Sequence, residues 1–582
     1  MKTRFIGILS FVLLIPITAV PGQGRDAAPA RPLKYDHNYT FSEVRSFLKT
    51  VSVDMPKLTT LHTIGKSFLG KDLLVLEITN KSTGGALKKP GFWMDGNLHS
   101  SEVFGCAVCL NTIETLLSGY GHDEEITRLL DTNAIYIMPK LNPDGSDYYL
   151  THPDGLRSSV RPHDSDRDGS FDEDPPDDLN QDGNITQMRI KDPLGTMRSD
   201  PEEPRLMVRR KEDETGEWRV LTEGVDNDHD GLFNEDGIGG LDINRNWPAQ
   251  WQQEYIQNGA GPFPLSEPET RAVAEFLFSH RNVTGIINHH MAGNFLYRPP
   301  NNRHFNPANG IEEPMPVEDS TVYSLFGKKY SEIINDQKVQ IVYGRGGPPR
   351  YGAIWGVMIG WAYDHYGAFS FVPEIGQYPC DYDEDGKVTQ AERLRWNDTE
   401  MGGEIFVDWQ PYDHPQLGKV EIGGFLSKIY NPKSESYINL MCHPGPVYRD
   451  FLKKHTAWNL YLASMSPRVQ ITSAERTSLG KGLTRIKISV QNQGFLPSHV
   501  THQALRNQTA KTVKARLQVN DAELVIGRPE TDVGHLPGNT PQSVSPIKTV
   551  EWVVKNAGDN PRVTVEVFSE KGGTETRTFR LD

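Results

Sequence analysis

The sequence predicts an α/β protein with a mixed, mostly parallel sheet flanked by helices, followed by a C-terminal all-β sandwich domain. From about residue 39 to residue 380, segments with helical apolar spacing alternate with short buried-strand patterns, which is typical of helices packed on a sheet. Beyond residue 460, strand-like runs separated by turn residues replace that alternation. The chain has 582 residues, of which 37% are hydrophobic, so we expect more than one folded unit.

The first part of the chain supplies alternating elements and one turn. The segment Asn142-Pro-Asp-Gly145 predicts the turn, because Asn-Pro and Asp-Gly favour turn conformations. The predicted elements are helices over 41–51 and 103–117, and strands over 73–78, 91–94 and 134–138.

The segment 162–240 interrupts this pattern. It is dense in Asp, Pro and Gly, and we interpret it as a long surface insertion held by metal ions. The alternation then resumes, and strand-like runs follow in the last part of the chain. These later elements are helices over 269–279 and 323–336, strands over 285–288 and 368–373, and C-terminal strands over 469–472, 484–491, 512–519, 549–554 and 562–568.

The N-terminal residues predict export. Lys2 and Arg4 precede an apolar stretch over 5–20 and a small-residue exit, which is typical of a secretory signal peptide over 1–24; a membrane anchor is the alternative. Residues 25–36 read as a linker. No later segment reaches spanning length, so we expect a secreted or periplasmic protein with no membrane span after signal removal. The formal net charge of -15 argues against nucleic acid as a partner, and the oligomeric state stays open.

Four cysteines are too few for a disulfide scaffold, although export permits bridges. Cys380 and Cys442 form a plausible pair. Cys106 and Cys109 fall in a predicted helix, where side chains three apart are poorly placed to bond each other. Their CxxC spacing would also suit redox chemistry or metal binding, but no second CxxC supports either.

A candidate metal site follows the buried strand over 91–94. His99 and Glu102 lie in the loop after that strand, where α/β proteins usually place ligands. They offer a nitrogen and an oxygen to Zn²⁺, and a catalytic zinc site needs a third protein ligand. An HxxE pattern alone is weak evidence, so the surrounding residues decide.

Those residues resemble a known family. The stretch Asp95-Gly-Asn-Leu-His99-Ser-Ser-Glu102 is similar to the first zinc motif of the carboxypeptidase A-type zinc metallocarboxypeptidases, peptidase family M14. Trp361 precedes Glu374 by thirteen residues, as in that family's pattern. The resemblance covers residues 40–380 and implies a carboxypeptidase-like domain over 37–465, followed by the β-sandwich over 466–582. Further similar blocks stand in the family's order at 142–145, 242–247, 266–270, 289–297 and 369–374.

The resemblance also implies roles for single residues. It favours His289 as the third zinc ligand, because Tyr297 follows it by eight residues, with His290 as the competing choice. Glu374 matches the family's general base, which takes a proton from water and passes it to the departing amine. Arg157 matches the oxyanion-stabilising arginine, with Arg161 as the alternative.

The resemblance extends to substrate binding. Asn244 and Arg245 match the pair that holds the terminal carboxylate, and a planar guanidinium suits that task. Counting back from Trp361 places Tyr351 near the position of a mobile tyrosine. The same count places Ile359 at the base of the side-chain pocket, which favours apolar C-terminal residues over basic ones.

A second metal is predicted from the acidic loop over 381–392. This loop matches the EF-hand pattern, with Gly386 at the sharp turn, and predicts a structural Ca²⁺. Weaker Asp-rich relatives occur in the insertion, beginning at Asp164, Asp178 and Asp226; we expect Ca²⁺ there to stiffen the rim of the active site. The proposed ligands of the main loop are Asp381, Asp383, Asp385, Lys387 and Glu392.

Three functions fit these motifs. The first is a zinc carboxypeptidase acting on the C-termini of peptides or proteins outside the cytoplasm. The second is a zinc peptidase acting on cell-wall peptides. The third is a calcium-dependent binding protein with a decayed site, against which the complete set of ligands and Glu374 argues.

Overall fold

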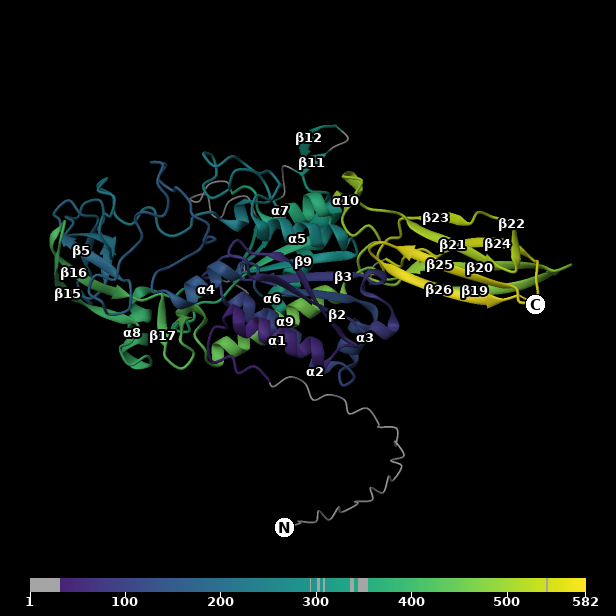
Figure 1. Cartoon of the computed structure of the whole chain (residues 1–582), viewed down its shortest axis with the longest axis horizontal. Coiled ribbons are helices and arrows are strands. Elements are labelled where there is room, and N and C mark those ends of the chain that lie inside the picture. The colour runs from purple at the N-terminus through teal and green to yellow at the C-terminus, as the bar shows by residue number, and fades with distance from the viewer. Residues whose placement is uncertain are drawn as a thin grey trace, which may run out of the picture.

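The structure is a computed structural model, and it describes residues 32–293, 295–300, 304–306, 309–334, 340–343, 354–540 and 543–581. Figure 1 shows a central sheet with helices on both faces, a smaller sheet at one end and the C-terminal strands at the other end. Among the described helices, none combines the length and the apolar character that a membrane crossing needs.

The central sheet is mixed. Within the described residues it has eight strands in the order β1-β2-β4-β3-β9-β14-β10-β13. The neighbours β4, β3, β9 and β14 run parallel, and antiparallel pairs flank them. Both faces of β9 are buried, as expected for a strand covered by helices on both sides. The strands are β1 (Thr59–Lys66), β2 (Asp72–Ile78), β3 (Gly91–Gly96), β4 (Ala134–Met138), β9 (Val283–Met291), β10 (Phe295–Arg298), β13 (Gln340–Tyr343) and β14 (Phe369–Ile375).

Helices cover the two faces of this sheet unequally. The larger apolar core lies under α1, α2, α3, α6 and α9, and the other lies under α5, α7 and the adjoining π-turn η5 (Ala362–Tyr366). Two short helices, α8 and α10, lie outside both layers. The helices are α1 (Phe41–Asp54), α2 (Phe104–Gly119), α3 (Glu124–Thr132), α4 (Pro143–Thr151), α5 (Pro268–Ser279), α6 (Val317–Ile334), α7 (Met358–Trp361), α8 (Gln390–Thr399), α9 (Pro446–Ser464) and α10 (His502–Arg506).

The predicted surface insertion carries strands of its own, which its density of Asp, Pro and Gly did not indicate. In the described part of the chain these strands join β15 and β16 in a six-stranded sheet, ordered β15-β16-β5-β8-β6-β7. Met188 packs there against Val420 and Ile422. The pairing was not foreseeable locally, because the partners lie about two hundred residues later. The strands of this lobe are β5 (Gln187–Lys191), β6 (Met197–Ser199), β7 (Met207–Arg209), β8 (Trp218–Thr222), β15 (Phe406–His414) and β16 (Gly418–Phe425). Two further hairpins are β17–β18 (Lys428–Asn431 and Ser436–Asn439), near this lobe, and β11–β12 (His304–Asn306 and Ile311–Glu313), beside α10 (Figure 1).

The C-terminal strands form the expected sandwich. Among the described residues two four-stranded sheets, β19-β20-β24-β22 and β23-β21-β25-β26, enclose one core of mainly Val and Ile side chains. Alternating burial along β20 and β25 shows the inward and outward faces. The strands are β19 (Val469–Gly480), β20 (Leu483–Asn492), β21 (Val513–Asn520), β22 (Ala522–Ile526), β23 (Glu530–Gly534), β24 (Lys548–Asn556), β25 (Arg562–Ser569) and β26 (Gly573–Arg580).

Two further expectations are corrected. The segment 142–145 opens α4 instead of forming an isolated turn: Asn142 caps the helix by accepting from Gly145 N at 3.0 Å, and Pro143 occupies its first position. The four cysteines are all buried free thiols, so Cys380 and Cys442 do not form the bridge considered plausible. The signal peptide over 1–24 and most of the linker over 25–36 lie outside the described residues.

Candidate metal and catalytic site

The loop between β3 and α2 is built to present two side chains. Asn97, with φ of 55°, turns the chain, and its amide donates to the carbonyls of His99 (2.8 Å) and Ser100 (3.1 Å). Ser100 N donates to the Arg157 carbonyl at 3.0 Å, which ties this loop to the segment carrying Arg157. His99 and Glu102 therefore sit on a loop whose backbone is fixed on both sides.

Three buried side chains converge at this loop. Within the described residues, His99, Glu102 and His290 form one cluster whose donor atoms all lie within 4.8 Å of one another. Glu102 Oε1 lies 2.7 Å from His99 Nδ1, and Glu102 Oε2 lies 2.8 Å from His290 Nδ1. The two Nδ1 atoms are 3.0 Å apart.

The outer nitrogens of both imidazoles are held by other residues. His99 Nε2 donates to Asp242 Oδ1 at 3.1 Å, and His290 Nε2 donates to Asn288 Oδ1 at 2.5 Å. Each Nδ1 is then left with its lone pair facing the other and the Glu102 carboxylate. Such a convergence of lone pairs requires a cation, and two imidazoles with one carboxylate are a catalytic zinc donor set. The residues present fit Zn²⁺.

The third ligand corrects the expectation of His289. Adjacent strand residues point to opposite faces, and His289 faces α2 and α9 instead of His99. Its Nδ1 donates to the Asp95 carbonyl at 2.7 Å, and its Nε2 lies 3.2 Å from Asn459 Oδ1. Burial lowers the pKa of His289 to about 4, so the ring is neutral. The count to Tyr297 did not fix the face, because a turn containing Ala292, with φ of 113°, follows β9.

Glu374 lies on β14 directly opposite His290 on β9. Side chains of residues opposite each other on neighbouring strands share a face of the sheet, so Glu374 points to the same side as the cluster. Burial and the nearby Glu102 carboxylate raise the pKa of Glu374 well above its ordinary value, and Arg157 partly offsets this. A half-buried carboxyl with a raised pKa beside a metal cluster suits a general acid–base.

Arg157 reaches across the entrance of the cluster. Its Nη1 donates to Glu102 Oε1 at 3.2 Å and its Nε donates to Asp242 Oδ2 at 3.3 Å. The side chain is 53% exposed, so a ligand can approach its guanidinium. Arg161 points elsewhere, with its Nε 3.0 Å from Glu267 Oε2. The structure therefore brings Arg157, and not Arg161, to the metal ligands.

Asn244 and Arg245 lie in the 3₁₀ turn η3 (Ile243–Arg245), which Asp242 caps. Asn244 Nδ2 lies 3.4 Å from His290 Nε2, and Asn244 Oδ1 accepts from Met358 N at 3.0 Å. This second contact brings the start of α7, and with it the buried Ile359, beside the predicted carboxylate-binding pair. Tyr351 lies outside the described residues.

Two residues that hold the histidine rings in place, Asp242 and Asn288, were not predicted from the sequence. Asp242 contacts His99 and Arg157 and lies 3.7 Å from Arg245 Nη1. Although burial opposes ionisation, the guanidiniums of Arg245 and Arg157 and the hydrogen bond from His99 hold the pKa of Asp242 well below its ordinary value. Asp242 opens the motif block 242–247, and Asn288 lies directly before the block 289–297, two residues before His290. The i+2 spacing in a strand was the available signal for Asn288 and for His290 as its partner.

The predicted calcium loop has the expected turn geometry. Asp381 Oδ2 accepts from Gly386 N at 2.8 Å, and Gly386 has φ of 83°. Oxygens of Asp381, Asp383 and Glu392 lie within 4.8 Å of one another. Glu392 also closes a capping box with Thr389, the residue before α8. A strand, β14, precedes this loop where an EF-hand would have a helix.

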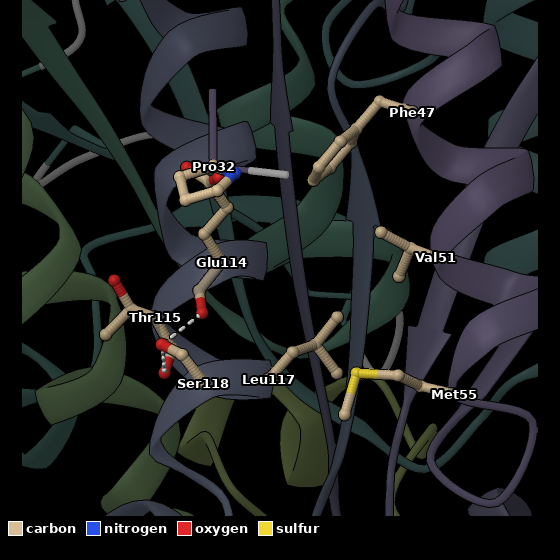
Figure 2. Close-up of a pocket in the computed structure, with 8 residues that line it drawn as sticks. All are labelled: Pro32, Phe47, Val51, Met55, Glu114, Thr115, Leu117 and Ser118. Atoms are coloured by element: carbon tan, nitrogen blue, oxygen red, sulfur yellow. Dashed lines mark hydrogen bonds between the residues drawn. The ribbon is translucent and has the colours of Figure 1, made fainter. Parts of the chain in front are cut away.

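An apolar pocket of about 240 Å³ lies elsewhere, between α1 and α2. Figure 2 shows Phe47, Val51 and Met55 facing Leu117 across it. Its acidic residue, Glu114, already accepts from Leu33 N and Tyr35 Oη at 2.7 and 2.5 Å. The lining contains none of the clustered residues, so this pocket is separate from the metal site.

Comparisons with known proteins agree with this geometry. Residues 44–383 match the family model Peptidase M14, described as zinc carboxypeptidase, and residues 468–580 match a domain of unknown function, DUF8731. Carboxypeptidase D from Mus musculus is 34% identical over 125 residues, covering 22% of this chain and 9% of that protein. Carboxypeptidase M from Mus musculus is 35% identical over 133 residues, covering 23% and 27%. The chain thus spans less than a third of the length of either relative.

The solved structures that resemble this chain have low sequence identity to it, as one example shows. Thrombin activatable fibrinolysis inhibitor is 17% identical with a TM-score of 0.43, and the alignment covers 76% of each chain.

Proposed function

Because the chain belongs to the zinc carboxypeptidase family, peptidase family M14, we propose that it hydrolyses the C-terminal peptide bond of peptides. The convergence of His99, Glu102 and His290 on one point, with Glu374 on the same face, is the observation that carries this proposal. The first listed relatives match only part of the chain, so the activity is inferred from its own residues.

The proposed reaction uses water as the nucleophile. Zinc held by His99, Glu102 and His290 would supply Lewis-acid polarisation of the scissile carbonyl and of the attacking water. Glu374 takes a proton from that water and passes it to the departing amine nitrogen. The guanidinium of Arg157 donates N–H groups to the oxygen on which negative charge develops.

Arg245 and Asn244 give the proposal its exopeptidase character. A guanidinium pairs with both oxygens of a terminal carboxylate, which an internal peptide bond lacks. Ile359, beside Asn244 through Met358, supports a preference for apolar C-terminal side chains. Faster release of C-terminal Lys or Arg than of Phe or Leu would contradict this preference.

Calcium and export complete the proposal. The loop over 381–392 offers clustered carboxylates of the kind that Ca²⁺ binds, and we assign it a structural Ca²⁺. The basic and apolar leader over 1–24 supports export to the periplasm or the medium, where peptides would be the substrates.

The test uses purified mature protein and peptides ending in Phe, Leu, Lys and Glu, each with a free or an amidated C-terminus. We expect stepwise loss of residues from the free-acid peptides only, abolished in Glu374→Gln while its zinc content remains one per chain. Cleavage of amidated peptides at equal rates would contradict a carboxypeptidase. Unchanged activity in Glu374→Gln would remove the assigned base.

A further inference from the structure

Two acidic loops of the insertion repeat each other. Residues 164–174 and 226–236 both read D-x-D-x-D-G-x-F-x-E-D. The backbone repeats as well, because the fourth, sixth and ninth positions of both loops have positive φ. These angles are 75°, 103° and 56° at Arg167, Gly169 and Asp172, and 69°, 96° and 59° at His229, Gly231 and Asn234.

The two loops also contact each other reciprocally. Ser165 N, at the second position of the first loop, donates to Asp236 Oδ2 at the end of the second loop (3.0 Å). Asn227 N, at the second position of the second loop, donates to Asp174 Oδ1 at the end of the first loop (2.8 Å). The loops are thus related by an approximate twofold exchange.

The carboxylates of the two loops form two groups, and exchanging the first loop for the second converts one group into the other. In the described residues, one group combines Asp166, Asp168 and Glu173 of the first loop with Asp228 of the second. The other combines Asp228, Asp230 and Glu235 of the second loop with Asp166 of the first. Each group therefore has positions three, five and ten of one loop and position three of the other. Asp166 and Asp228 belong to both groups.

Buried oxygens without partners point into these groups. Asp236 is fully buried, and a carboxylate oxygen of it lies within 4.8 Å of oxygens of Asp164 and Asp166. Among the described residues Asp236 Oδ1 has no hydrogen-bond partner, and neither oxygen of Glu173 or Glu235 has one. Buried carboxyl oxygens normally have hydrogen-bond partners. The lack of partners shared by these oxygens therefore indicates a cation site.

We propose that these loops hold a pair of divalent calcium ions, bridged by Asp166 and Asp228. Four carboxylates for each ion suit Ca²⁺, which takes six to eight oxygen ligands in flexible geometry, whereas Mg²⁺ keeps most of its waters. The donors include no nitrogen or sulfur, which separates this paired site from the zinc cluster. The sequence pattern of each loop alone suggests a single ion; the shared bridges follow only from the structure.

The test removes calcium from the full-length protein, restores one equivalent of zinc, adds Ca²⁺ back and counts the bound ions by native mass spectrometry. Glu235→Gln should lose one ion relative to the unaltered chain, and the bridging variant Asp228→Asn should lose two. Asp383→Asn, in the separate loop over 381–392, is the matched control: it should lose only the ion of its own loop, so that combining it with Asp228→Asn loses two more. A loss of one ion or none in Asp228→Asn would overturn the shared site.

A second measurement needs no variant. Limited proteolysis of the unaltered protein, titrated with Ca²⁺, should show both loops becoming resistant at one common Ca²⁺ concentration. Protection of the two loops at concentrations differing tenfold or more, or of neither loop, would overturn the paired site. Neither readout depends on peptidase activity, so failure of the proposed function would not affect the result.

Discussion

At the scale of single residues, two consecutive histidines of β9 have different roles. His290 faces His99 and Glu102, whereas His289 lies between the Asp95 carbonyl and Asn459 on the other side of the sheet. Gly105 of α2 allows this second packing, because a Cβ there would lie 2.9 Å from His289 Cβ. The alternation of strand side chains therefore separates metal binding from packing within one dipeptide.

We expect His290→Ala to lose zinc and His289→Ala to keep it. Removing His290 takes away one of three ligands, whereas removing His289 leaves a cavity and an unpaired carbonyl, at a cost of about 2–4 kcal/mol. Zinc analysis together with thermal unfolding measures both effects. A folded but zinc-free His289→Ala protein would contradict the assignment.

Arg245→Ala should lower kcat/KM for free-acid peptides roughly 30- to 150-fold, because a charge-assisted hydrogen bond contributes about 2–3 kcal/mol. Residual cleavage of C-terminally amidated peptides should not change, since they lack the group that Arg245 binds. The measurement compares the two peptide series in both proteins. An equal loss on amidated peptides would indicate a structural role instead.

At the scale of elements, the first turn of α5 contains a buried carboxyl group with an unpartnered oxygen. Glu269 is 1% exposed, and its Oε1 accepts from Phe68 N at 2.9 Å. Its Oε2 has no partner among the described residues. Burial, together with the charges of Glu267 and Asp144, raises the pKa of Glu269 to about 7. The start of α5 therefore favours the protonated acid over the carboxylate.

Glu269→Gln should stabilise the protein above neutral pH. Between pH 4.5 and about 7 the unfolded chain has lost this proton and the folded chain retains it, so folding stability falls as pH rises. Glutamine removes that fall, which is worth up to about 3 kcal/mol. The difference in apparent Tm between variant and parent should grow from pH 4.5 to 7 and then stay level; a constant difference would contradict it.

Elements with local signals were predictable. The bounds of β4 match the predicted strand over 134–138, because a continuous apolar run defines it locally. The strands of the insertion were missed, because β5 pairs with β16, more than two hundred residues later. The zinc loop was identified from its motif, whereas His290 was not chosen. The strand β9 is buried on both faces and carries a histidine on each, so polarity gave no sign of which face held the site.

At the scale of the whole molecule, the insertion that builds the peripheral lobe begins and ends beside residues of the candidate site. Ser159 N donates to the Leu241 carbonyl at 2.9 Å, joining the two ends of the insertion. The first end follows Arg157 and the second precedes Asp242, which both contact the metal ligands. The acidic loops thus adjoin the segments that place Arg157 and Arg245.

Calcium removal should lower the apparent Tm and raise KM more than it lowers kcat. The loops carry eleven carboxylates, whose repulsion would loosen the insertion ends beside Arg157 and Asp242. Each site filled to a hundred times its Kd contributes about 2.7 kcal/mol. The measurement uses EGTA with one equivalent of zinc restored, and calcium re-addition as the control. An unchanged Tm would contradict a structural role for calcium.

The C-terminal domain contacts the beginning of the site-bearing strand. Lys571 Nζ donates to the Val283 carbonyl at 2.6 Å and lies 4.1 Å from the Tyr366 ring centroid. Lys571→Ala should therefore lower the apparent Tm by removing a buried hydrogen bond, worth about 0.5–1.5 kcal/mol, without changing zinc content. Loss of zinc in a folded Lys571→Ala protein would show that this contact acts on the metal site.

The lobe is built from two distant segments of the chain, so its strands are synthesised at different times. Strand β5 begins at residue 187, and its partner β16 begins at residue 418. A ribosome adds roughly 5–20 residues per second, so β5 waits on the order of ten to fifty seconds for β16 to be made. The two acidic loops are separated by only 51 residues and can meet within the first seconds of that interval. The calcium concentration around the nascent chain therefore decides whether the lobe waits for β16 as a closed loop pair or as an open chain.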